Sequence, residues 1–174
     1  MKVILIDVAS VDGKLTKGNS ATIHDWTSQE DATHFQKVKS ENNLLVMGSG
    51  TFEKADIKPE KERLRIVLTE TPEKYMQYEI LNELEFSNET PKELIKRLEK
   101  KGFKQMLLVS GRRLASSFFE EKLIDELWLT IEPRIFGLGE PIIDEKEYAI
   151  RLKLLTMKKL NAQGTILLQY KVLK

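Results

Sequence analysis

The sequence predicts an α/β protein of three layers, with a mixed, mostly parallel central sheet, an antiparallel C-terminal hairpin and helices on both faces. Three observations lead to this prediction. Apolar strand-like runs alternate with helical segments through the first two-thirds of the chain. The last third contains strand-like runs with no helix between them. A polar segment that ends in glycine, residues 161–164, separates the last two of these runs and favours a hairpin.

The predicted strands are apolar runs bounded by polar or glycine residues. The first, residues 3–9, is interrupted only by Asp7, which is typical of a buried central strand. A shorter strand, with the weakest apolar pattern, is expected at residues 80–86. The other strands are expected at residues 44–47, 63–69, 105–109, 124–132, 152–160 and 165–173. The polar and irregular residues 14–27 form a long loop, and such loops often lie over binding sites.

Three helices are predicted from their caps and from apolar residues at helical spacing. Ser28 is the expected N-cap of the first helix. The second covers residues 91–102, with proline in its first turn and glycine at its end. The third covers residues 112–121. One face of the first helix is shared by Asp31, Phe35, Val38 and Asn42.

Composition limits the classes of function. The chain of 174 residues is 41% hydrophobic, which predicts a single domain over residues 1–174. A net charge of +1 gives no reason to expect a nucleic-acid partner. Cysteine is absent, and His24 and His34 match no usual metal motif, so we expect no metal. No apolar stretch is long enough to span a bilayer, and we expect a cytoplasmic protein with no membrane partner.

Two turns repeat one arrangement, in which an apolar strand leads through glycine into a helix start. Residues 48–51 read Gly-Ser-Gly-Thr, and residues 110–113 read Ser-Gly-Arg-Arg. Such turns present backbone N–H groups and a helix N-terminus to an anion. Each turn alone is also ordinary loop punctuation, and neither matches the GxGxxG or GxxxxGK[ST] pattern. Together they suit a ligand with two phosphates, such as a dinucleotide, and therefore indicate a cofactor-using enzyme.

The basic pair Arg112-Arg113 allows two interpretations. Both arginines could neutralise Glu120 and Glu121 on the same short helix. Alternatively they bind an anionic ligand, because a cation at a helix start opposes the helix macrodipole and an anion would relieve that conflict.

Asp31 and Asp12 also leave two interpretations open. Asp31 could close a capping box with Ser28. It could instead be a proton donor, since apolar surroundings on its helix face would raise its pKa. Asp12-Gly13 could be an ordinary turn, which requires no chemistry, or part of a loop beside a substrate.

Four segments carry a resemblance to a known family. They are residues 8–14 (Val-Ala-Ser-Val-Asp-Gly-Lys), 26–31 (Trp-Thr-Ser-Gln-Glu-Asp), 47–53 (Met-Gly-Ser-Gly-Thr-Phe-Glu) and 123–142, which begins Leu-Ile-Asp-Glu-Leu and ends with Glu-Pro-Arg-Ile-Phe-Gly-Leu-Gly-Glu-Pro-Ile. The last segment is the most specific. The chain resembles the dihydrofolate-reductase-like superfamily over essentially its whole length. Within it, the riboflavin-biosynthesis reductase domain is the closer match.

The resemblance implies a reduced nicotinamide cofactor over the carboxyl ends of the central strands. This would be NADPH, with NADH possible because Glu70 would repel a 2′-phosphate if it faced the site. Ala9 would meet the nicotinamide through its backbone, and Thr69 would approach the adenosine ribose. The implied phosphate contacts are Gly48, Ser49 and Thr51 at one helix start, and Ser110, Gly111, Arg112 and Arg113 at the other.

The same resemblance implies a substrate site and an assembly. The implied substrate residues are Asp12, Gly13, Ser28 and Lys39. Lys39 stands where the riboflavin branch often has arginine. Arginine binds a phosphate with a planar fork, whereas lysine offers a point charge, so Lys39 is a departure from the pattern for a phosphoribosyl substrate. A homodimer through the late antiparallel strands is expected.

These observations lead to one main hypothesis. The protein is an NAD(P)H-dependent oxidoreductase that transfers hydride to a small heterocycle, either a riboflavin-pathway phosphoribosylaminouracil or a pterin-like compound. Asp31 is the candidate proton donor. The alternatives are a non-catalytic nucleotide-binding protein of the same fold and a broad-specificity detoxifying or resistance reductase.

Overall fold

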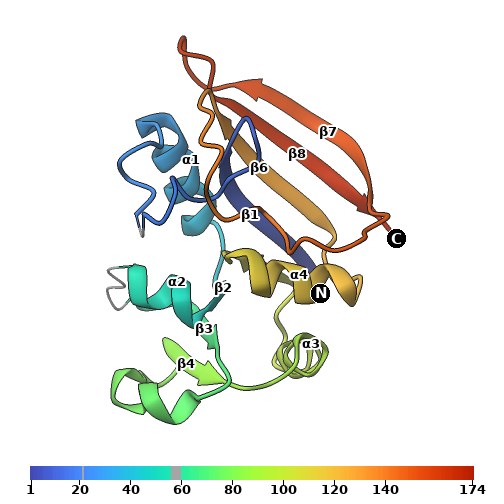
Figure 1. Cartoon of the computed structure of the whole chain (residues 1–174). Helices are drawn as coiled ribbons and strands as arrows, with labels where there is room; N and C mark the ends of the chain where they lie inside the picture. Colours follow the sequence, from blue (N-terminus) through green and yellow to red (C-terminus); the bar gives the residue numbers. More distant parts are fainter. Residues whose placement is uncertain (21, 56–59) are drawn as a thin grey trace.

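The computed structural model describes residues 1–20, 22–55 and 60–174, and its strands form a single mixed sheet (Figure 1). The order of strands across the sheet is β4-β3-β2-β5-β1-β6-β8-β7. The strands are β1 (Lys2–Ser10), β2 (Leu44–Gly48), β3 (Leu64–Leu68), β4 (Leu84–Ser87), β5 (Gln105–Leu108), β6 (Glu126–Glu132), β7 (Arg151–Lys159) and β8 (Ile166–Leu173).

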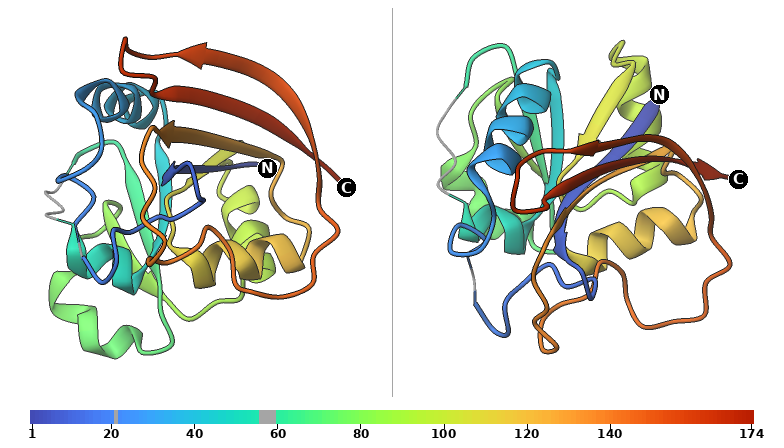
Figure 2. Two further views of the ribbon diagram at one scale, coloured as in Figure 1. Left: turned by 45° about the horizontal axis from the view of Figure 1, so that its top comes forward. Right: turned by 90° about the horizontal axis from the view of Figure 1, so that it is seen from above.

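Helices cover both faces of this sheet, as predicted (Figure 2). The helices are α1 (Gln29–Ser40), α2 (Ser49–Lys54), α3 (Pro91–Lys100), α4 (Arg112–Glu120) and the 3-10 helix η1 (Pro72–Tyr78). We call the side of the sheet that carries α1 and α2 the α1 face, and the side that carries α3 and α4 the α4 face.

The central strand β1 is buried on both faces, which explains its continuous apolar sequence. Val3 and Leu5 belong to the larger core cluster on the α4 face, where they join buried side chains of α3 and α4. Ile4 and Ile6 belong to a second cluster on the α1 face with Val38 of α1. The two clusters hold the helices against opposite faces of the sheet.

The strand directions place six strand ends together. β1 runs parallel to β5 and β6, β2 runs parallel to β3 and β5, and β3 runs parallel to β4. The carboxyl ends of β1 to β6 therefore lie along one edge of the sheet, which we call the carboxyl edge. β8 pairs antiparallel with β6 and β7, which confirms the predicted C-terminal hairpin.

One predicted strand is shorter than expected. The weak pattern at residues 80–86 becomes strand only from Leu84, because η1 and a turn occupy the preceding residues. Asn82 in that turn has a φ of 61°, a left-handed conformation that ends extended structure.

Candidate functional site

The two glycine turns lie side by side at the carboxyl edge. They follow β2 and β5, which are neighbours in the sheet. A side-chain Cβ placed on Gly48 would lie 3.8 Å from Leu114 Cδ2 in α4, so the first turn packs directly against the helix that follows the second turn. Both helix starts therefore lie at one edge of the sheet.

The start of α4 carries polar groups that have no partner among the described residues. Ser110 is only 3% exposed, and its Oγ makes no hydrogen bond there. Arg112 Nε is likewise buried without a partner. No side chain caps α4 or α2, whereas Ser28 and Thr90 cap α1 and α3. The uncapped N–H groups, the hydroxyl and the guanidinium are the donors that a phosphate requires, so the residues present fit the nucleotide cofactor.

Arg112 does not neutralise the acids of its own helix. Its Nη1 lies 2.8 Å from Asp144 Oδ1, in the loop between β6 and β7. Glu120 pairs with Lys146, and Glu121 pairs with Lys92. The first interpretation of the basic pair is therefore wrong for Arg112, since the loop supplies the partner.

Asp31 is a buried acid near the carboxyl edge, on the α1 face. It is 7% exposed. Burial raises the pKa of its carboxyl from 3.8 to about 6; the hydrogen bond from Thr130 opposes that rise, and the negative charge of Glu132 adds to it. Thr130 and Glu132 belong to β6, so α1 and β6 together create the environment of the acid.

The capping-box interpretation of Asp31 is only half right. The Asp31 N–H donates to Ser28 Oγ at 3.2 Å, which confirms Ser28 as the N-cap. The Ser28 N–H, however, donates to Glu132 Oε1 at 2.7 Å. Because Glu132 takes the position that Asp31 would fill in a capping box, the Asp31 carboxyl is left to face Thr130.

Asp12 and Gly13 follow β1 at the same edge, and Asp12 has a clear structural role. Its carboxylate accepts hydrogen bonds from Ser10 Oγ at 2.6 Å, Gly137 N at 2.7 Å and Phe136 N at 3.1 Å. These bonds, chiefly the one from Ser10, lower the pKa of Asp12 to about 2. Asp12 thus fastens the loop after β6 to the loop after β1; contact with a substrate stays a prediction.

The remaining predicted residues occupy different places. Ala9 is fully buried in β1 one residue from the carboxyl edge, and Thr69 directly follows β3 at that edge. Arg113 follows Arg112 in the first turn of α4. Lys39 lies at the other end of α1, about 12 Å along the helix from Asp31, and its Nζ pairs with Glu60 at 2.9 Å. The structure therefore does not bring Lys39 to the other substrate residues.

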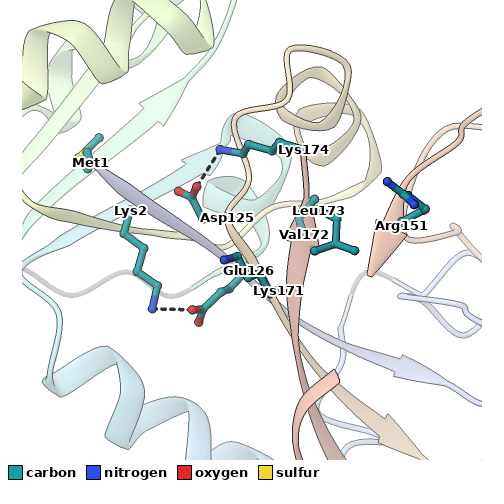
Figure 3. A pocket seen from close by; sticks show the side chains of 9 residues that line it. All are labelled: Met1, Lys2, Asp125, Glu126, Arg151, Lys171, Val172, Leu173 and Lys174. Atoms are coloured by element: carbon teal, nitrogen blue, oxygen red, sulfur yellow. Dashed lines mark hydrogen bonds and ion pairs between the residues drawn. The ribbon is translucent and has the colours of Figure 1, made fainter. Parts of the chain in front are cut away.

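A polar cavity of about 410 Å³ opens beside Ser28 and Glu132. The cavity is lined by the start of α1, the end of β6 and the β7–β8 turn. Its lining residues include Trp26, Arg134, Asn161 and Thr165. A larger hollow of about 780 Å³ lies at the opposite edge, where the two chain ends meet (Figure 3). Two of its lysines are neutralised, Lys2 by Glu126 at 2.8 Å and Lys174 by Asp125 at 2.7 Å, and it contains none of the predicted site residues.

Two classes of feature are missing from the part of the chain that the structure describes. Residues 1–20, 22–55 and 60–174 contain no group of three or more histidine or acidic side chains placed to hold a metal ion. Within the same ranges, no helix has the length and apolar character needed to cross a membrane.

Sequence reasoning missed two residues of this site. Thr130 and Glu132 were visible only as part of a late strand and of a family motif, although both are buried, at 2% and 3% exposure. The available signal was a polar residue at alternate positions of an otherwise apolar strand, which predicts a polar stripe on one face.

Comparison with known proteins defines the class and then the family. The fold is that of the dihydrofolate-reductase-like proteins. The crystal structure of a putative riboflavin biosynthesis protein from Shewanella sp. PV-4 matches with a TM-score of 0.80 at 22% identity, covering 100% of both chains. A pyrimidine reductase-like protein from Corynebacterium diphtheriae matches with a TM-score of 0.79 at 17% identity, covering 99% of this chain and 92% of its own.

The sequence profile of the RibD C-terminal domain matches residues 1–166, and the chain belongs to that family. Its sequence is also similar to that of the uncharacterized protein YwjB of Bacillus subtilis (strain 168), with 24% identity over 161 residues that cover 87% of this chain and 89% of YwjB.

Proposed function

We propose that residues 1–174 form a single NADPH-dependent reductase domain that transfers hydride to a small heterocyclic substrate of the riboflavin-pathway type. The observation that carries the proposal is that the buried acid Asp31 and the uncapped starts of α2 and α4 all lie near the carboxyl edge. Membership in the RibD C-terminal domain family supports the same chemistry. An enzyme that uses this reductant works where the cell supplies it, so we place the protein in the cytoplasm.

The cofactor would be held mainly at the start of α4. The hydroxyl of Ser110, the N–H groups after Gly111 and the guanidinium of Arg112 would bind one phosphate, with Arg113 close by. Gly48, Ser49 and Thr51 would face the same ligand from the start of α2, and Thr69 would approach its ribose. When bound, the reduced nicotinamide supplies the hydride.

Asp31 would supply the proton. Because its pKa is about 6, the carboxyl holds a proton well above the pH at which an exposed aspartate loses it. Burial between α1 and β6 also excludes water from the acid. Asp12 and Gly13 would shape the loop beside the substrate, and Ser28 would fix the helix that carries Asp31.

Cofactor titration by calorimetry tests this function. NADPH and NADH are titrated into the native protein, the R112A variant and an R151A control, whose substitution lies at the opposite edge (Figure 3). We expect micromolar binding of NADPH that R112A weakens about tenfold, as for the loss of a charge-assisted hydrogen bond, and that R151A leaves unchanged. Absence of binding at millimolar cofactor would refute the proposal.

Cofactor oxidation across a panel of acceptors separates the remaining alternatives. Oxidation with phosphoribosylaminopyrimidines alone would support the riboflavin-type substrate, and oxidation with pterins alone would identify the pterin-like one. Oxidation with many unrelated acceptors, nitro compounds included, would indicate a detoxifying reductase. Binding without any oxidation would indicate a non-catalytic nucleotide-binding protein.

A homodimer through β7 and β8 is proposed from the exposed apolar side of this hairpin. Every residue of β7 is exposed. Leu155 is an extra residue between Leu154, which pairs with Tyr170, and Thr156, which pairs with Gln169. This bulge keeps Leu154 and Met157, 48% and 67% exposed, on one face of the hairpin. An edge strand with such an apolar face is suited to a second copy of the chain.

Sedimentation velocity at tens of micromolar tests the dimer. We expect the native protein to sediment as a dimer and M157K as a monomer, while K153E, on the other face of β7, stays dimeric. A native protein that sediments as a monomer would refute this assembly.

A further inference from the structure

We propose that Glu132 is a positioning residue for the acid Asp31: its carboxylate anchors the first turn of α1 to β6, and its charge favours the proton on Asp31. The importance of this role for catalysis rests on the function proposed above. The role itself is a property of the free protein.

Glu132 joins three elements at the carboxyl edge. Its Oε1 accepts from the Ser28 N–H at 2.7 Å, which fixes the N-cap of α1. Its Oε2 accepts from Thr165 Oγ1 at 2.7 Å, which fixes the chain just before β8. Asn161 of the hairpin turn donates in turn to Thr165 Oγ1 at 2.9 Å. Both oxygens of Glu132 act as acceptors, which is the role of an ionised carboxylate.

This geometry places a second negative charge beside Asp31. Thr130 and Glu132 lie two residues apart on β6 and therefore project from the same face, toward α1. Thr130 bonds to Asp31, so Glu132 is the next side chain along that face. A negative charge at this position disfavours a second one on Asp31, so Asp31 keeps its proton to a higher pH.

Other charged groups on α1 and after β6 have neighbours of their own. On α1, Glu30 is turned to Asn161 Nδ2 at 3.1 Å, and His34 faces Lys158 of β7. After β6, Arg134 Nε donates to the Trp26 carbonyl at 3.1 Å. Among these groups, the charge that bears on the pKa of Asp31 is that of Glu132.

The test compares the loss of the charge with the loss of a hydrogen bond alone. The carboxyl carbon of Asp31 is titrated by NMR in the cofactor-free native protein, in E132Q and in T165V. T165V removes one hydrogen bond to Glu132 but keeps its charge. We expect an Asp31 midpoint near 6 in the native protein and in T165V. In E132Q we expect a lower midpoint, because the negative charge that favours the proton is lost.

Equal midpoints in the native protein and E132Q, or a shift in T165V as large as that in E132Q, would overturn the proposal. If E132Q does not fold, E132L removes the charge without needing hydrogen bonds, and its Asp31 midpoint is judged in the same way. In an active enzyme, the pH at which kcat/KM falls is expected to shift by the same amount. Absence of cofactor oxidation with the NMR shift intact would refute the reductase proposal and leave the role of Glu132 standing.

Discussion

Replacing Asp31 by asparagine is expected to make the protein more stable at neutral pH and to remove its proton donor. The carboxyl has a pKa of about 6 in the folded protein, against 3.8 when exposed. The folded state therefore binds more protons than the unfolded state between these two values, and its stability falls as the pH rises through this window. A difference of about two units corresponds to about 3 kcal/mol at 1.36 kcal/mol per unit. D31N lacks this loss, because its amide does not ionise.

Urea unfolding followed by tryptophan fluorescence, at several pH values from about 4 to 8, measures this difference. The free energy of unfolding of D31N relative to the native protein is expected to rise by about 3 kcal/mol between the lowest and highest pH. Titrating groups that do not interact with Asp31 cancel in the comparison. If the two stability curves ran parallel, the carboxyl could not have the proposed environment. Cofactor oxidation by D31N is expected to fall at least a hundredfold, the scale of general acid catalysis.

Two further predictions concern the loop that Asp12 fastens. Gly139→Ala would place a Cβ 2.1 Å from the Thr16 carbonyl oxygen and is expected to cost more than 2 kcal/mol in unfolding experiments, on the order of other steric insertions. Gly137→Ala, at a φ of 66° with open space around its Cβ position, is the control and is expected to cost about 1 kcal/mol; equal costs would refute the close approach. Asp12→Ala is expected to speed hydrogen exchange at the Phe136 and Gly137 amides while leaving β1 protected, and unchanged exchange at both amides would contradict the fastening role.

Local chemistry explains which features the sequence could predict. The central strands were visible because burial on both faces requires continuous apolar runs. Ser28 was visible because an N-cap depends on neighbours three residues away. The glycine turns were visible as the ends of apolar runs, and in the structure they follow the neighbouring strands β2 and β5.

Contacts between distant residues explain what the sequence could not predict. Asp31 meets Thr130 and Glu132 across about a hundred positions of chain, and no periodicity records such a pairing. Arg112 finds Asp144 in an irregular loop for the same reason. The capping-box pattern at Ser28 was misleading because Glu132 of β6, and not Asp31, accepts the hydrogen bond from the Ser28 N–H.

The bulge at Leu155 has a consequence for how this family can vary in length. Leu154 and Thr156 already pair with adjacent residues of β8, so a chain that lacked Leu155 would close into a regular ladder. Every other side chain of the hairpin would keep its face. The loss of Leu155, or of a neighbour whose place in the ladder Leu155 can take, therefore keeps the register, whereas the loss of a more distant residue of β7 would turn over the residues between that position and the bulge. Relatives that differ by one residue in this strand are expected to place the gap here.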